Sequence, residues 1–152
     1  MGAEFWSYFV PYQEDIGAAL EALREQEFRA GRFRQPSQVQ PGFLGRMLGR
    51  PPSKPKPPAS IQEAIRVADT DATGTRSILD MERISDTPGS GTLSPVPRDE
   101  LGRLFGTEQP TREMVEQSEE LIERIDRGQG IYVITYQQGK PDGIYFGGYS
   151  YD

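Results

Sequence analysis

A basic, proline-rich segment interrupts this chain of 152 residues. Residues 32–59 contain seven prolines and show no sustained helix or strand period, apart from a turn predicted at residues 43–48. Proline fixes φ and lacks a backbone donor, so a run of prolines is excluded from the interior of a helix or sheet. We therefore expect a single domain over residues 1–152, with residues 32–59 as a long loop or arm within it.

Charge is distributed unevenly along the chain. No acidic residue lies between Glu27 and Glu63, but seven cations do: Arg29, Arg32, Arg34, Arg46, Arg50, Lys54 and Lys56. The net charge of the chain is −6, so the remaining residues carry −13. The basic arm could fold back on this acidic body, bind an acidic protein, or bind phosphate groups of nucleic acid or lipid. We do not expect nucleic acid, because the body would be repelled and no recognition helix is evident.

The chain contains neither cysteine nor histidine. This composition excludes thiol nucleophiles, Ser-His-Asp triads and ordinary zinc, copper or haem sites. Any chemistry must use carboxylates, hydroxyls, Lys or Arg, and no cofactor is expected apart from the Ca²⁺ considered below. The start of the sequence lacks a secretory signal pattern and no apolar run is long enough to span a membrane, so we expect a cytoplasmic, bacterial protein.

Hydrophobic periodicity predicts an α+β fold. Helices are predicted at residues 14–30, 61–68, 98–106 and 111–128, and strands at 4–13 and 75–85, followed by a hairpin over 131–152. Residues 86–97 are predicted to form a loop. Gly31 is placed to end the first helix, and the sequence Ser60–Ile61–Gln62–Glu63 is a capping box for the second. We expect a mainly antiparallel sheet of about four strands, with three to four helices mostly on one face.

Aromatic residues alternate along the predicted strands, so that those of one strand share a face. The predicted binding surface consists of Trp6, Tyr8, Tyr12, Tyr132, Tyr136, Tyr145, Tyr149 and Tyr151. We expect helices to cover the opposite face, over Phe5, Phe9, Val133, Ile144 and Phe146. Ordinary cross-strand packing would also explain the tyrosines, but exposed Tyr and Trp suit recognition. We predict a non-catalytic protein-binding domain, such as a bacterial immunity or regulatory protein.

A second interpretation is a small enzyme or ligand-binding domain. It requires Arg76, Glu82, Tyr132, Tyr136 and Tyr145 to converge on a pocket between the sheet and the arm. A cavity containing these groups would favour this interpretation, whereas a flat exposed aromatic face would favour protein binding.

A third interpretation is a single Ca²⁺ site in the sequence DTDATGTRSILD at residues 69–80, which resembles an EF-hand loop. Asp69, Asp71, Thr73 and Asp80 occupy positions 1, 3, 5 and 12, with Gly74 at the turn position 6. Position 8, which is normally apolar, is Arg76, and position 12 is Asp in place of the bidentate Glu. A turn rich in Asp, Thr and Gly explains the same residues.

Overall fold

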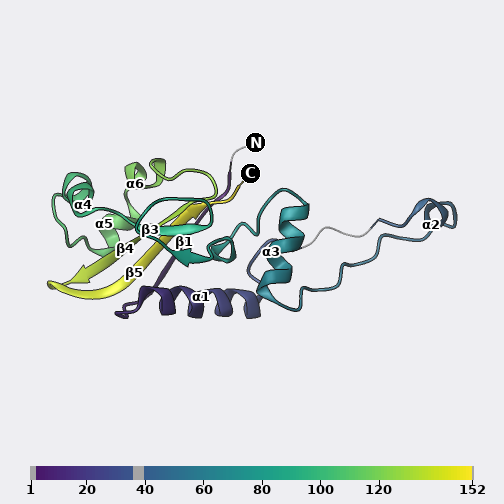
Figure 1. Ribbon diagram of the computed structural model, residues 1–152, viewed down its shortest axis with the longest axis horizontal. Helices are drawn as coiled ribbons and strands as arrows, with labels where there is room; N and C mark the ends of the chain where they lie inside the picture. Colours follow the sequence, from purple (N-terminus) through teal and green to yellow (C-terminus); the bar gives the residue numbers. More distant parts are fainter. Residues whose placement is uncertain (1–2, 36–39, 152) are drawn as a thin grey trace.

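The computed structural model describes residues 3–35 and 40–151. A mixed sheet of five strands forms the body of the molecule, on the left in Figure 1. In spatial order the strands are β1 (Phe5–Pro11), β5 (Lys140–Tyr149), β4 (Gly130–Gln137), β3 (Thr92–Pro95) and β2 (Arg83–Ile84). Strand β5 pairs with β1 and β4 in antiparallel fashion, whereas β3 pairs with β4 and β2 in parallel. The prediction of an α+β fold is confirmed, but the sheet has one strand more than expected and is partly parallel.

Helices cover both faces of this sheet, although more of them lie on one face than on the other. On one face, α1 (Ile16–Ala30) packs Leu20 and Leu23 against a cluster that contains Trp6 and Phe146. On the other face, α4 (Arg98–Phe105), α5 (Arg112–Glu116) and α6 (Glu119–Glu123) cover Val133 and its neighbours. The remaining helices are α2 (Phe43–Met47), α3 (Ile61–Thr70) and the 3₁₀ turn η1 (Ile78–Asp80).

Local capping signals explain why three helices lie close to their predicted ranges. The Asp15 carboxylate accepts a hydrogen bond from the Ala18 amide (3.0 Å) at the start of α1, and Gly31 ends it in the left-handed region. At the start of α3, the Ser60 hydroxyl accepts from the Glu63 amide (3.2 Å). Helix α4 likewise ends before a left-handed glycine. Each signal lies within one turn of the helix end that it specifies, so local sequence predicts it.

The predicted helix over residues 111–128 is wrong, because two short helices with separate caps replace it. Ser118 separates them, and its hydroxyl accepts a hydrogen bond from the Leu121 amide (3.2 Å) at the start of α6. Serine offers the backbone a hydrogen-bonding alternative to a continuous helix, which is why it favours helix starts over interiors.

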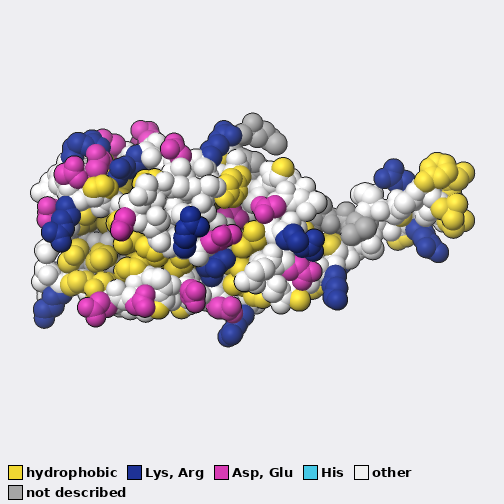
Figure 2. All heavy atoms as spheres, in the orientation of Figure 1, with side chains coloured by type: hydrophobic (Ala, Val, Ile, Leu, Met, Phe, Trp, Pro, Cys, Tyr) yellow, Lys and Arg dark blue, Asp and Glu magenta, His cyan; other side chains and the backbone are white. Residues whose placement is uncertain are grey.

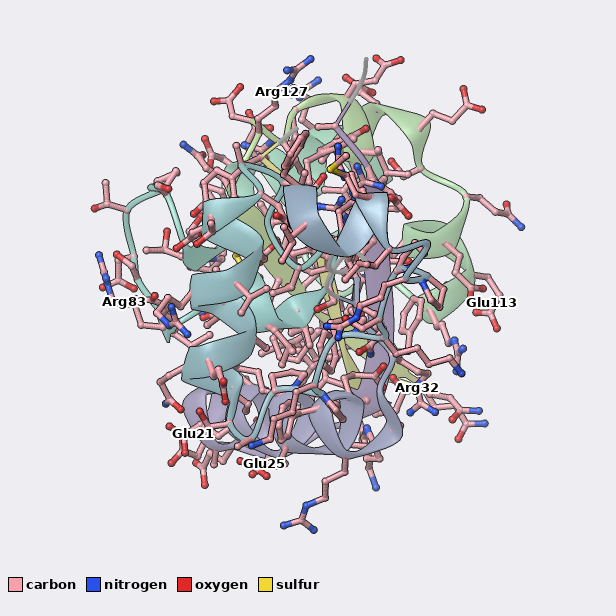
Figure 3. All side chains as sticks on the ribbon, turned by 90° about the vertical axis from the view of Figure 1, so that its right-hand side faces the viewer. Glu21, Glu25, Arg32, Arg83, Glu113 and Arg127 are labelled. Atoms are coloured by element: carbon pink, nitrogen blue, oxygen red, sulfur yellow. The ribbon has the colours of Figure 1, made fainter. Side chains whose placement is uncertain are left out.

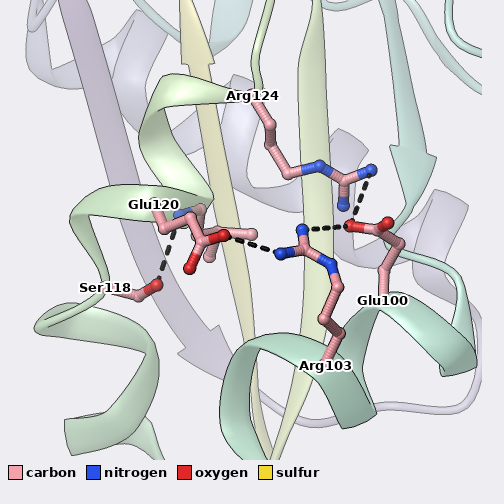
Figure 4. A network of polar contacts seen from close by, with 6 residues as sticks. Glu100, Arg103, Ser118, Glu120 and Arg124 are labelled. Carbon is pink, nitrogen blue, oxygen red and sulfur yellow. Dashed lines mark hydrogen bonds and ion pairs between the residues drawn. The ribbon is translucent and has the colours of Figure 1, made fainter.

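Ion pairs join α4 to α6 and to Arg124, the residue that follows α6. The Arg103 guanidinium contacts the carboxylates of Glu120 (2.7 Å) and Glu100 (3.1 Å), and Arg124 contacts Glu100 at 3.5 Å (Figure 4). These side chains are at least partly exposed, so the network orients the helices more than it stabilises them.

The predicted strand over residues 75–85 is wrong in most of its length. Its centre forms η1, where the Ser77 hydroxyl accepts from the Leu79 amide (3.2 Å), and only Arg83–Ile84 form β2. Strand β3 lies within residues 86–97, which were predicted to form a loop.

The C-terminal hairpin is confirmed as β4 and β5, which meet at Gln138 and Gly139. Both of these residues have positive φ, the geometry of a type I′ hairpin turn.

Candidate functional site

The proline-rich arm projects from the body and carries α2 at its far end (Figure 1). The base of the arm is attached to the body, since the Phe33 ring stacks on Phe28 at 5.9 Å between centroids. At the tip, the Arg46 side chain donates to the Pro41 carbonyl (3.1 Å) and the Arg50 amide donates to the Gly45 carbonyl (2.9 Å). These bonds fold the tip into a compact turn of its own.

This turn exposes an apolar surface, which we call the arm tip: Phe43, Leu44, Met47 and Leu48. Between 68% and 78% of each residue is exposed to solvent, and the group forms the hydrophobic cluster at the end of the arm in Figure 2. The four residues have the spacing i, i+1, i+4 and i+5, which places them on one side of a helix. None of them belongs to a hydrophobic cluster of the body. Contiguous exposed apolar residues of this kind mark interaction sites.

Four cations of the arm have no acidic partners among the described residues. Ion pairs between described residues involve none of Arg46, Arg50, Lys54 and Lys56. The interpretation that the arm folds back on the acidic body is therefore wrong for the tip. The body presents acidic side chains outward, among them Glu21, Glu25 and Glu113 in the view from the arm (Figure 3).

The predicted aromatic binding surface does not exist as one face. Trp6, Tyr8 and Tyr132 lie in the cluster beneath α1, whereas Tyr145 and Tyr149 lie in the cluster on the opposite face. Only 6% of Trp6 and 3% of Tyr145 is exposed.

The register of β1 against β5 accounts for this error. Tyr8 lies opposite Phe146 and Phe9 lies opposite Tyr145. Because residues directly opposite each other share a face of the sheet, Tyr145 shares a face with Phe9 and not, as predicted, with Tyr8. Of the eight predicted residues, Tyr12 and Tyr151 are exposed, and Tyr136 lies beyond a β-bulge in β4. Whether any of these rings contacts a partner stays a prediction.

The pocket required by the enzyme interpretation is assembled only in part. Tyr132 and Tyr136 line a common pocket of about 210 Å³ together with Arg98 and Glu108. Burial raises the pKa of Tyr132, with a smaller contribution from the charge of Asp86. This volume is below the roughly 300–1,000 Å³ that is usual for small-molecule sites.

The other three residues of that interpretation do not line this pocket. Tyr145 lies on the face of the sheet opposite to Tyr132, and burial raises its pKa to about 12. Arg76 forms an ion pair with Glu4 (3.3 Å), on the N-terminal side of β1. Glu82 borders a separate groove between α1 and β2.

The segment that resembles an EF-hand loop is organised around a buried carboxylate. Asp80 Oδ1 accepts hydrogen bonds from the amide and the hydroxyl of Thr75, both at 2.7 Å. Burial raises the pKa of Asp80, and the nearby charge of Asp69 adds to the effect. Ala72, Gly74 and Arg76 all have positive φ, so this carboxylate is bonded to a strained turn.

The remaining predicted calcium ligands are arranged differently from those of an EF-hand. Asp69 and Asp71 are exposed, and the Thr73 hydroxyl accepts a hydrogen bond from the Arg34 guanidinium. No three acidic side chains within residues 3–35 and 40–151 converge as a metal site. The calcium site stays a prediction that this geometry does not favour.

Comparisons of the chain with models of protein families, with characterised proteins and with solved structures found no match. Within the described residues, no helix has the length and apolar character to cross a bilayer. The arm tip was missed by sequence reasoning, although the apolar spacing from Phe43 to Leu48 was its signal.

Proposed function

We propose that this protein is a non-catalytic protein-binding domain that docks on a partner through its arm tip. The observation that supports the proposal is the exposure of four large apolar side chains at the end of a projecting arm. Leaving these side chains in water is unfavourable, so burial in a partner would stabilise a complex by about 25 cal/mol for each Å² of apolar surface removed from water.

The surroundings of the arm tip define the chemistry of the partner. A short helix with one apolar side fits an apolar groove, as helical recognition segments commonly do. Arg46 and Arg50, which contact the turn at the tip, favour acidic residues at the rim of that groove, because complementary charge increases the association rate. Such a partner is a protein with a hydrophobic cleft bordered by Asp and Glu, of the kind that an immunity or regulatory protein would cover.

The proposal is tested by photocrosslinking. Phe43 is replaced by benzoylphenylalanine, and the protein is irradiated in lysate from its source organism. A matched variant carries the same crosslinker at Gln62, which is exposed on α3 away from the arm tip. We expect one protein to crosslink from position 43 and not from position 62.

Binding of the purified partner then decides whether the arm tip carries the affinity. Leu44→Asp should weaken binding at least about tenfold, because one buried leucine contributes more than 1.4 kcal/mol. An unchanged affinity would contradict the proposal. A second contradicting result is that the wild type binds anionic phospholipid vesicles and Leu44→Asp does not, because the arm tip would then be a membrane anchor.

A further inference from the structure

Strand β1 is an edge of the sheet whose outer side has no strand beside it in the described structure. It pairs with β5 alone, in a continuous register from Phe5 opposite Tyr149 to Pro11 opposite Gly143. Hydrogen bonds at both ends show which residues face β5: the Ser150 amide donates to the Glu4 carbonyl (2.9 Å), and the Tyr12 amide donates to the Asp142 carbonyl (3.3 Å).

The backbone groups on the outer side follow from this pattern. In an antiparallel pair, alternate residues direct both N–H and C=O toward the partner strand. Because Glu4 and Tyr12 point toward β5, the even-numbered residues between them do so as well. Phe5, Ser7 and Phe9 therefore direct their N–H and C=O groups outward, and β1 presents a row of donors and acceptors that can pair with another strand.

This edge lacks the features that normally prevent association. Exposed edge strands are usually very short, or carry charges, an internal proline or a bulge. Strand β1 spans seven residues, FWSYFVP, with no charge and no register shift, and its proline is the last residue. The opposite edge of the sheet is protected by comparison, since β2 has two residues and one of them is Arg83.

The sequence of β1 is nearly symmetric about Ser7. Phe5 and Phe9 flank it at two residues, and Trp6 and Tyr8 flank it at one. If two such strands pair in antiparallel fashion around Ser7, Phe5 lies opposite Phe9 of the other copy and Trp6 opposite Tyr8. The cross-strand pair of Phe5 and Phe9, which are both partly exposed, is favourable, whereas the Trp6 ring is already buried beneath α1. The small, exposed Ser7 leaves room where the two strands are related by the two-fold axis.

We propose that β1 pairs with β1 of a second copy of this chain, in antiparallel register centred on Ser7, and joins the two sheets into one. The outward-facing residues Phe5, Ser7 and Phe9 then each form a hydrogen-bonded pair across the interface. Pro11 falls beyond the pairs, opposite Ala3 of the other copy, so its missing N–H interrupts nothing. A two-fold interface of this kind is closed and gives a dimer, not a fibre.

The absence of cysteine from the chain provides a direct test. Ser7→Cys introduces the only thiol, and opposite Cα atoms in a hydrogen-bonded pair are about 5.5 Å apart, which suits a disulfide. The matched control is Gln62→Cys on the exposed side of α3. On oxidation, we expect Ser7→Cys to form a linked dimer at least about tenfold faster than the control, because pairing raises the effective thiol concentration to the millimolar range.

Mass and amide exchange of the unlinked protein complete the test. Light scattering should give twice the chain mass of 17.0 kDa for the wild type, and Ser7→Lys, which brings two like charges together at the axis, should give a folded monomer. The amides of Phe5, Ser7 and Phe9 should exchange slowly in the wild type and rapidly in Ser7→Lys. A monomeric wild type overturns the proposal, and so does a dimer that persists in Ser7→Lys. A dimer that dissociates in Leu44→Asp but not in Ser7→Lys also overturns it, because the two copies would then associate through the arm tip.

Discussion

Replacement of Asp80 by alanine should destabilise the protein, because the Asp80 carboxylate is an internal hydrogen-bond acceptor. Its carboxylate accepts from the Thr75 amide and hydroxyl at 2.7 Å, and Thr75 is fully buried. In Asp80→Ala the hydroxyl of Thr75 keeps its contact with the Ser77 hydroxyl at 2.9 Å, but the amide loses its acceptor. A buried amide without an acceptor costs about 1–3 kcal/mol.

Two smaller effects act in opposite directions. The space left by the carboxylate adds up to about 1 kcal/mol, whereas removing a carboxylate whose charged form is disfavoured by burial offsets part of the loss. We therefore expect a net decrease of about 2–3 kcal/mol in the free energy of unfolding. For a domain of this size, each kcal/mol lowers Tm by about 2–4 °C, so Tm should fall by about 4–12 °C.

The assay compares Asp80→Ala with Asp69→Ala by urea denaturation and thermal unfolding, each with Ca²⁺ and with chelator. Asp69 is exposed, so its replacement should change stability by no more than about 0.5 kcal/mol. Both residues are ligands in the calcium interpretation. Equal effects of the two substitutions, or a wild-type Tm that rises with Ca²⁺, would falsify the reasoning that Asp80 acts as an internal hydrogen-bond acceptor.

Three further predictions concern packing, ionisation and the arm tip. Gly148→Ala should cost about 1–3 kcal/mol in denaturation experiments, because the added Cβ would lie 2.3 Å from Cζ2 of Trp6; a neutral result would contradict the packing described. The pKa of Tyr145 is about 12, so the stabilising effect of its neutral phenol is complete below pH 10 and lost as pH rises toward 12. Unfolding free energies should therefore fall by about 2 kcal/mol more in the wild type than in Tyr145→Phe when the pH is raised from 10 to 12. The double substitution of Phe43 and Leu44 by Asp should leave Tm within about 2 °C by circular dichroism, because both side chains are already exposed; a larger decrease would mean that the arm tip packs on the body.

Elements whose signals are local were predicted well. The caps at Asp15 and Ser60 and the left-handed glycine at position 31 act within one helical turn, and the hairpin turn at Gln138–Gly139 is equally local. The parallel strands were not predicted, because their pairing depends on residues far apart in sequence. Leu93 pairs with Gly130, and nothing in the four residues of β3 specifies that partner.

The candidate site shows the same division between local and long-range information. Alternation correctly placed Trp6 and Tyr8 on one face of the sheet. It could not establish which residues of β5 lie opposite those of β1, and the predicted aromatic face depended on that register. The apolar spacing from Phe43 to Leu48 was visible in the sequence. That these residues extend away from the body is a tertiary property, since the same spacing would suit a helix packed on the core.

The position of β5 has a consequence for synthesis on the ribosome. This strand follows the other four strands of the sheet in sequence but lies between β1 and β4 in space, so β1 acquires its neighbour only after residues 140–149 have emerged. Joining segments so distant in sequence requires closure of a long loop, which slows folding. During translation the aromatic residues of β1 stay without their final partner, and a nascent chain of this protein should be a substrate for chaperones that hold extended apolar segments.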